Sequence, residues 1–246
     1  MTTNVLDLVA SIAVTDSRWS ISTPSFFVYL DDPGFEKMVA KKPFLFVFAG
    51  AGSLIQKWKD WANALPNSLH DMPDFSKESR AMAITITDMD KSAVLFERIQ
   101  RHVEFNARFA GSGALHAFAY WKDNGDAMGA VRSAILMDRC SGGEIKFYKF
   151  DGRNNLDERI RFEQLVEIFS KKGLIMRTNQ NTEQALVPIN EEAARDPEVA
   201  CLVSSITSGQ AEIISPCEEM YIPWKEEEKR RFTRVATNIA KNLGGE

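Results

Sequence analysis

The sequence lacks several features that mark specialised classes of protein. Its longest apolar run, residues 44–51, has the length of a strand and falls well short of the roughly 18 residues that a membrane span requires. The chain has only three cysteines, widely spaced and without a CxxC pair, which argues against a disulfide framework and a cysteine metal site. It has no stripe of lysine and arginine, and its net charge of −4 argues against a nucleic-acid-binding protein.

The N-terminus also lacks the basic segment and apolar stretch of a signal peptide, so we expect a cytoplasmic protein with reduced cysteines. What the sequence does have is enough apolar material for a core, because 44% of its 246 residues are hydrophobic and 26% are charged. This composition excludes a disordered or fibrous chain. The length lies between one and two domains of roughly 150 residues each.

Apolar runs bounded by turn residues predict strands, and stretches with a helical period predict helices. The clearest strand is 43–49, which ends at Gly50 and precedes a helical stripe over 54–62. Further strands are predicted at 4–14 (as a hairpin), 26–30, 81–87, 93–99, 102–109, 144–150, 157–161 and 201–214. Further helices are predicted at 114–122, 126–139, 162–172 and from Pro223 to 244. This order indicates a layered α+β fold and not the regular alternation of a Rossmann fold or barrel.

The first candidate for chemistry is Thr2, which directly follows Met1. Removal of the methionine would leave Thr2 with a free α-amine, a group whose ordinary pKa is about 7.7–8.0. That amine can act as a general base toward the hydroxyl of the same residue. Many chains begin with Met-Thr without any catalytic consequence, so both interpretations stay open.

A second candidate combines Asp16, at the end of the first hairpin, with Lys37. A buried Asp–Lys pair beside a terminal threonine would lower the pKa of the amine and hold the lysine in place. The alternative is a strand-end turn with a solvated lysine, and Lys41 and Lys42 lie close by in the sequence.

Glycine turns at 50–52, 111–113 and 142–143 are the third candidate. Junctions of this kind can present backbone N–H groups to an oxyanion. Their spacing does not match the glycine-rich loops that bind nucleotides. The alternative is that these glycines serve close packing and chain reversal.

Together, the segments FAGAG, GSGALHA and DRCSGGEIKFY, with the preceding Thr-Thr and Asp-Ser-Arg, resemble the proteasome β subunits and the HslV-type peptidases. These belong to the N-terminal nucleophile hydrolases. The resemblance implies a four-layer αββα sandwich of two antiparallel sheets. It covers a core at 1–172 and leaves a C-terminal extension at 173–246, which we expect to pack on the core or on a neighbouring subunit.

The resemblance also implies roles for individual residues. Thr2 would be the nucleophile with its own amine as proton acceptor, Asp16 would pair with Lys37, and Lys41 is the alternative lysine. The Gly50 N–H would be the oxyanion donor. Three residues would support the amine and its water beside the turn at Gly142: Ser112, Asp138 and Ser141. Four residues would line a substrate pocket, which the two aromatic side chains would narrow: Trp19, Ser20, Phe48 and Gly52.

The function implied is that of a threonine endopeptidase acting through an acyl-enzyme, in a homo-oligomeric ring or double ring. Its substrates would be peptides or unfolded proteins. An ATPase unfoldase is a partner compatible with the family, and no metal, cofactor, nucleic acid or membrane is expected. A catalytically silent subunit with a role in assembly is the alternative, favoured by Trp19 and by the long tail. A third interpretation is an amidase of the same fold that acts on a small molecule.

Overall fold

Two antiparallel sheets form the centre of the computed structural model, which describes residues 2–67, 72–73, 82–178, 186–217 and 222–244. The first sheet starts with a hairpin of β1 (Asn4–Asp7) and β2 (Ile12–Thr15). It is completed on either side of this hairpin, in the order β11-β2-β1-β10-β9. The added strands are β9 (His102–Val103), β10 (Ala107–Ala110) and β11 (Lys146–Lys149).

The second sheet is larger and is built around β6 (Phe44–Ala51), whose residues are all buried. Such a continuous apolar strand requires cover on both faces. Its order is β13-β12-β4-β3-β14-β6-β7-β8, with β5 also paired to β6. The other strands are β3 (Trp19–Ser22), β4 (Phe26–Leu30), β5 (Met38–Lys41), β7 (Met82–Asp88), β8 (Ala93–Arg98), β12 (Leu174–Arg177), β13 (Val187–Pro188) and β14 (Ile214–Ser215).

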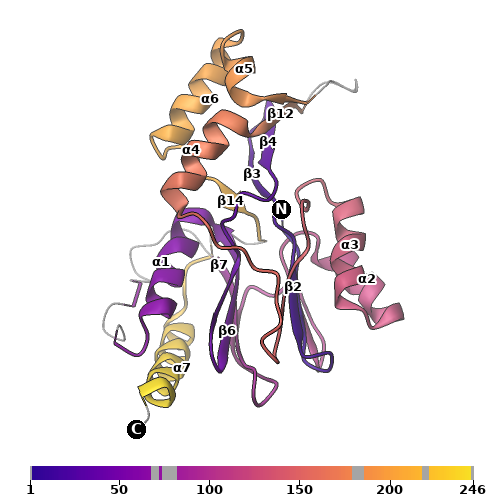
Figure 1. The fold of residues 1–246 in the computed structure, drawn as a ribbon, viewed down its shortest axis with the longest axis vertical. Helices are drawn as coiled ribbons and strands as arrows, with labels where there is room; N and C mark the ends of the chain where they lie inside the picture. The colour runs from indigo at the N-terminus through magenta and orange to yellow at the C-terminus, as the bar shows by residue number, and fades with distance from the viewer. Residues whose placement is uncertain (1, 68–71, 74–81, 179–185, 218–221, 245–246) are drawn as a thin grey trace.

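Helices cover the outer face of each sheet (Figure 1). α2 (Ala114–Asn124) and α3 (Ala127–Met137) pack on the first sheet, against an apolar cluster that includes Val14 and Phe109. α1 (Gly52–Ala64) and α7 (Glu226–Gly244) pack on the second sheet. A cluster that includes Leu6 and Leu45 fills the space between the sheets, so the fold has four layers.

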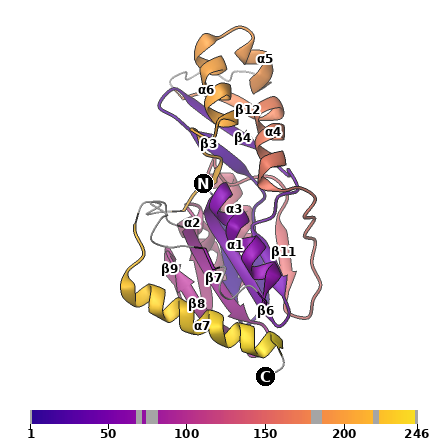
Figure 2. The same cartoon turned by 90° about the vertical axis from the view of Figure 1, so that its left-hand side faces the viewer.

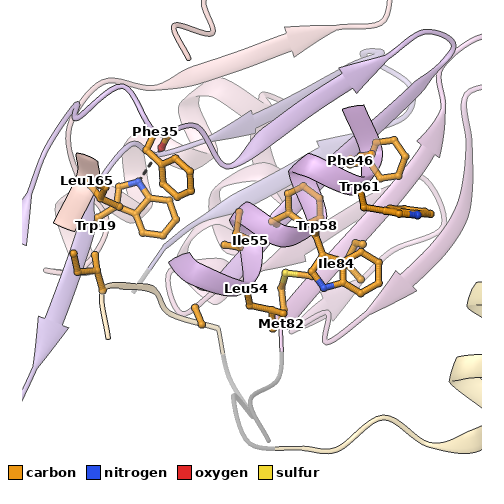
Figure 3. Packing of buried hydrophobic residues seen from close by; sticks show 14 of the residues in the cluster. Trp19, Phe35, Phe46, Leu54, Ile55, Trp58, Trp61, Met82, Ile84 and Leu165 are labelled. Atoms are coloured by element: carbon orange, nitrogen blue, oxygen red, sulfur yellow. Dashed lines mark hydrogen bonds between the residues drawn. The ribbon is translucent and has the colours of Figure 1, made fainter. Parts of the chain in front are cut away.

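The largest core lies between the second sheet and its helices (Figure 3). Trp58 and Trp61 of α1 pack edge to face with each other and contact Phe232 of α7. Figure 2 shows α7 crossing β7 and β8 beside α1. Aromatic side chains of this size contribute much of the buried apolar area of a core.

The remaining helices gather at one end of the molecule (Figure 1). They are α4 (Phe162–Lys172), α5 (Ile189–Ala193) and α6 (Pro197–Thr207). No helix in the described ranges is long and apolar enough to cross a membrane. The segment after residue 172 contributes β12 beside β4, β14 within the second sheet and α7 on its outer face. The division of the chain at residue 172 stays a prediction.

The predicted α+β class with two antiparallel sheets is confirmed. Three predicted strands are wrong. In the segment 201–214, residues 201–207 belong to helix α6 and only Ile214 lies in a strand. The helix forms because Asp196 caps it by accepting a hydrogen bond from the Glu198 N–H and because Pro197 occupies its first turn. The segment 102–109 is a short hairpin of β9 and β10, and 157–161 forms no strand because its amides at 159 and 160 bond to the Gly34 carbonyl.

Candidate active site

The first residues of the chain lie in the interior, where Thr2 and Thr3 are fully buried. Close contact with the turn at 111–113 positions them. The Gly113 N–H donates to the Thr2 carbonyl at 3.3 Å. A Cβ at Gly111 would meet that carbonyl oxygen at 2.0 Å, and the φ of Gly111 is +87°. Glycine at position 111 is therefore required both by space and by backbone conformation.

Thr2, Asp16 and Lys37 form a buried polar triad. The Lys37 Nζ donates to Thr2 Oγ1 at 2.5 Å and to Asp16 Oδ1 at 3.0 Å. Thr2 Oγ1 in turn donates to the same oxygen of Asp16. The three residues are at most 1% exposed, so these contacts form in a medium from which water is excluded. Electrostatic interactions are stronger there than at the surface.

Backbone amides fix the Asp16 carboxylate from both sides. Its Oδ1 accepts from the Thr3 N–H at 2.8 Å, and its Oδ2 accepts from the N–H groups of Gly142 and Arg18 at 3.1 and 3.2 Å. A buried charge needs such partners. The Gly142 turn therefore holds the carboxylate that faces Thr2 and Lys37.

Lys37 reaches this site because it directly precedes β5 and its backbone is held against β6. Its carbonyl accepts from the Phe48 N–H at 2.8 Å, and its ammonium lies 5.6 Å from the centre of the Trp19 ring. Burial lowers the pKa of Lys37, and the charge of Asp16 opposes that shift. Lys41 lies elsewhere, with its Nζ donating to the Asn63 carbonyl at 2.9 Å. Of the two candidate lysines, Lys37 is the one that contacts Thr2.

A second set of hydrogen-bonded polar side chains lies beside the triad and contacts the hydroxyl of Thr3. Ser112 and Ser141 both donate to Asp138 Oδ2, at 2.9 and 2.8 Å. Ser141 Oγ is also 2.8 Å from Thr3 Oγ1. Because the single hydroxyl proton of Ser141 goes to Asp138, the Thr3 hydroxyl is the donor in that contact. This network fixes the neighbour of Thr2 and does not contact the backbone nitrogen of Thr2, which donates to the Pro216 carbonyl at 3.3 Å.

Gly50, the residue that the resemblance assigns to the oxyanion, lies near the end of β6 with a φ of +142°. This backbone conformation is one that glycine adopts far more readily than other residues. Its strand partner on one side is Ser215 of β14.

The four residues assigned to a substrate pocket lie in two kinds of surroundings. Trp19 and Phe48 are fully buried members of the large core, and the Trp19 indole donates to the Phe35 carbonyl at 3.0 Å (Figure 3). Ser20 pairs with Ile214 of β14, and the Gly52 N–H donates to the Ile213 carbonyl at 2.9 Å. The aromatic pair therefore belongs to the core, and the other two contact the segment around β14.

The sequence interpretation missed the segment 213–217, which lies against Thr2, Ser20 and Gly50. Its two-residue strand carries no alternation long enough to recognise, and its partners are far away in the sequence. No pattern in the sequence could have placed this segment at the candidate site.

A second buried lysine, Lys59 of α1, lies outside the triad. Its Nζ donates to the Glu36 carbonyl at 2.8 Å and to Glu158 Oε2 at 2.5 Å. Burial lowers the pKa of Lys59 and raises that of Glu158, while their mutual attraction opposes both shifts. Lys59 contacts no hydroxyl in the hydrogen bonds described, so this pair ties α1 to the chain near Glu36 and Glu158. Within the described ranges, no group of three or more His, Cys, Asp or Glu side chains is arranged to hold a metal ion.

No protein-family model matches the chain, and a search of curated proteins found no match. Among solved structures, the chain is similar to Thiobacillus denitrificans BPH in complex with epoxomicin. The TM-score is 0.39 and the identity 13%, over 60% of this chain and 96% of that one. It is also similar to eukaryotic HslV from Trypanosoma brucei, with a TM-score of 0.32 and 16% identity over 54% of this chain and 98% of that one. At these values neither likeness bears on the activity of this chain.

Proposed function

We propose that the chain is a threonine peptidase in which Thr2 is the nucleophile. The observation that carries this proposal is the 2.5 Å contact between Lys37 Nζ and Thr2 Oγ1 inside a triad completed by Asp16. A hydroxyl beside an oriented cation and a fixed carboxylate has the arrangement of an activated nucleophile. The resemblance of the sequence to proteasome β subunits and HslV-type peptidases supports the same reaction.

Cleavage of the bond between Met1 and Thr2 is part of the proposal. It would turn the Thr2 amide nitrogen into an α-amine with an ordinary pKa near 8, close enough to neutrality to accept a proton. The α-amine nitrogen and Oγ1 both belong to Thr2, so no other part of the chain has to position the base beside the nucleophile. Lys37, which donates to Oγ1, would stabilise the negative charge that develops there.

The reaction then has two stages. Thr2 Oγ1 attacks the carbonyl carbon of the scissile peptide bond while its proton passes to the α-amine, and the Gly50 N–H donates to the oxyanion. The C–N bond breaks, the leaving amine takes the proton, and an ester remains on Thr2. Water attacks this ester, which releases the carboxylic acid and restores the hydroxyl.

Two variants of Thr2 test the assignment. Thr2→Ala and Thr2→Ser both keep a small residue after Met1 and differ in the hydroxyl. We expect Thr2→Ala to slow hydrolysis of an unstructured fluorogenic peptide by a factor on the order of 10³ or more, and Thr2→Ser to retain measurable activity. Intact mass measures whether Met1 is removed. Retention of Met1 in all molecules, or a Thr2→Ala protein as fast as the unmodified chain, would contradict the proposal.

We also propose that the chain acts in the cytoplasm on peptides or unfolded proteins and assembles into a homo-oligomeric ring. The ring and the substrate class rest on the sequence resemblance alone, and the location rests on the few, widely spaced cysteines. Negative-stain images of the purified protein test it, since particles the size of a monomer would exclude a ring. A catalytically silent subunit stays the alternative, and it is favoured if the ring forms while Thr2 remains blocked by Met1.

A further inference from the structure

β14 joins two parts of the second sheet that are otherwise not paired. Ile214 pairs with Ser20 of β3 on one side and with Ala51 of β6 on the other, and Ser215 pairs with Gly50. All three pairings are antiparallel. Without this strand, β3 and β6 would each present an open edge toward the other. Two facing edges form a position in which an extended peptide can pair with both.

The same segment covers the candidate nucleophile. The Pro216 carbonyl accepts from the Thr2 N–H at 3.3 Å, and the Ile213 carbonyl accepts from the Gly52 N–H at 2.9 Å. With this segment in place, Thr2 is 0% exposed. Residues 213–217, here called the blocking strand, therefore occupy the position beside Thr2 that a peptide paired with both edges would take.

Apolar side chains anchor both ends of the blocking strand, but its middle carries a buried polar side chain without a partner among the described residues. Ile213 belongs to the large core, and Cys217 packs on Ala49 and Ala83. Between them, the Ser215 Oγ is fully buried and has no hydrogen-bond partner among the residues that the structure describes. An unsatisfied buried hydroxyl costs about 1–3 kcal/mol, so a strand selected only for stability would carry an apolar residue there. A peptide without that defect would bind the two edges more favourably.

We infer that the blocking strand is an internal pseudosubstrate, which closes the site until an extended peptide with an aliphatic residue in the place of Ile213 displaces it. This inference rests on the proposed function of Thr2 as a nucleophile. In the resting protein only the fraction of molecules with a displaced strand binds substrate, and the apparent affinity falls by that fraction. Activity is therefore regulated by the chain's own C-terminal segment.

Proline at position 214 removes a backbone N–H from a strand that pairs on both sides and should release it. Ile214→Val keeps the N–H and the β-branched side chain and is the matched control. We expect Ile214→Pro to raise kcat/KM for an unstructured peptide by about tenfold or more, and Ile214→Val to stay near the unmodified protein. Where the unmodified protein hydrolyses the peptide measurably, a folded Ile214→Pro protein, verified by circular dichroism, with unchanged or lower kcat/KM would overturn the inference.

Binding in trans gives a readout that does not depend on hydrolysis. A fluorescent peptide with the sequence of residues 211–217 (AEIISPC) should bind the Ile214→Pro protein, as measured by fluorescence anisotropy. It should bind the unmodified protein more weakly, because there it competes with the blocking strand. A peptide with Asp in the place of Ile213 is the control and should not bind. Equal binding of the first peptide to both proteins, or no binding to Ile214→Pro, speaks against an exchangeable strand.

A reversible lock covers the case in which the proline variant does not fold. Ser20 and Ile214 are direct strand partners, so Ser20→Cys and Ile214→Cys in one protein place two thiols within reach of a disulfide. Cys201→Ser in the same protein removes an exposed thiol. Oxidation should suppress hydrolysis and reduction should restore it; measurable hydrolysis at the same rate in both states contradicts the inference. If peptide binding follows the predictions and no variant hydrolyses any peptide, the strand exchange stands and the proposed peptidase function falls.

Discussion

Lys37 and Lys59 have closely similar surroundings but different kinds of partner. Each side chain is at most 4% exposed, each ammonium pairs with a carboxylate, and burial lowers the pKa of both. Each also lies near an aromatic ring, Trp19 for Lys37 and Phe35 for Lys59. Lys37 donates to the Thr2 hydroxyl, whereas Lys59 donates to a main-chain carbonyl.

This difference shows why a perturbed lysine is not by itself a site. Desolvation acts on both side chains in the same way, and ion-pair networks shift pKa values without any catalytic role. The carboxylates differ as well: that of Asp16 is fully buried and fixed by three amides, whereas the side chain of Glu158 is 42% exposed. What separates Lys37 is a nucleophilic atom within hydrogen-bond distance.

The largest effect is expected on hydrolysis. Lys37→Met removes the charge beside Thr2 Oγ1 and should lower kcat/KM by a factor on the order of 10³, while Lys59→Met should change it by less than about threefold. Lys37→Arg is a second variant, because it keeps the charge opposite Asp16 but presents a planar fork in place of a point donor. Peptide hydrolysis by folded Lys37→Met at the unmodified rate would remove Lys37 from the mechanism, whereas activity in Lys37→Arg alone would show that a positive charge is enough. Equal losses in the Lys37 and Lys59 variants would erase the distinction between the two lysines.

Sequence patterns predicted the fold best where the determinants are local. The apolar run of β6 and the helical stripe of α4 are predicted within two residues of their ends. The prediction failed at α6, where β-branched residues indicate a strand but Asp196 and Pro197 start a helix. Here the chemistry of the helix start outweighs the preference of the side chains for strands.

The candidate site was accessible from the sequence only in part. Thr2, Asp16 and Lys37 stand out through short motifs in a particular order, and the structure brings these three together. The contact of Ser141 with Thr3 and the place of β14 depend on pairings between distant segments. Such contacts follow from the packing of the whole chain, and no local pattern encodes them.

A smaller effect is expected on stability, at Lys59. Lys59→Met keeps the aliphatic stem but leaves the Glu36 carbonyl and Glu158 without this donor, which should lower the free energy of unfolding by about 1–3 kcal/mol. Lys122→Met, at an exposed position of α2, is the control and should stay within about 0.5 kcal/mol. Urea denaturation measures both. A Lys59→Met protein as stable as the control would mean that the buried pair contributes nothing beyond its desolvation cost.

The smallest effect concerns the pH dependence of stability, in which the two lysines should be alike. Burial lowers the pKa of each below the ordinary value of 10.5 in the folded protein, so between the two values the unfolded chain binds more protons. The free energy of unfolding therefore contains a contribution that rises with pH through this window and is lost as pH falls through the lowered pKa. Lys37→Met and Lys59→Met should each make the rise of the free energy of unfolding between pH 7 and pH 9.5 shallower than in the unmodified protein, measured by urea denaturation at both pH values.

An unchanged dependence of the free energy of unfolding on pH in either variant would show that attraction to the carboxylate cancels desolvation at that lysine. If both variants lose slope while only the Lys37 variant loses hydrolysis, burial accounts for the titration of both lysines and contact with Thr2 accounts for catalysis.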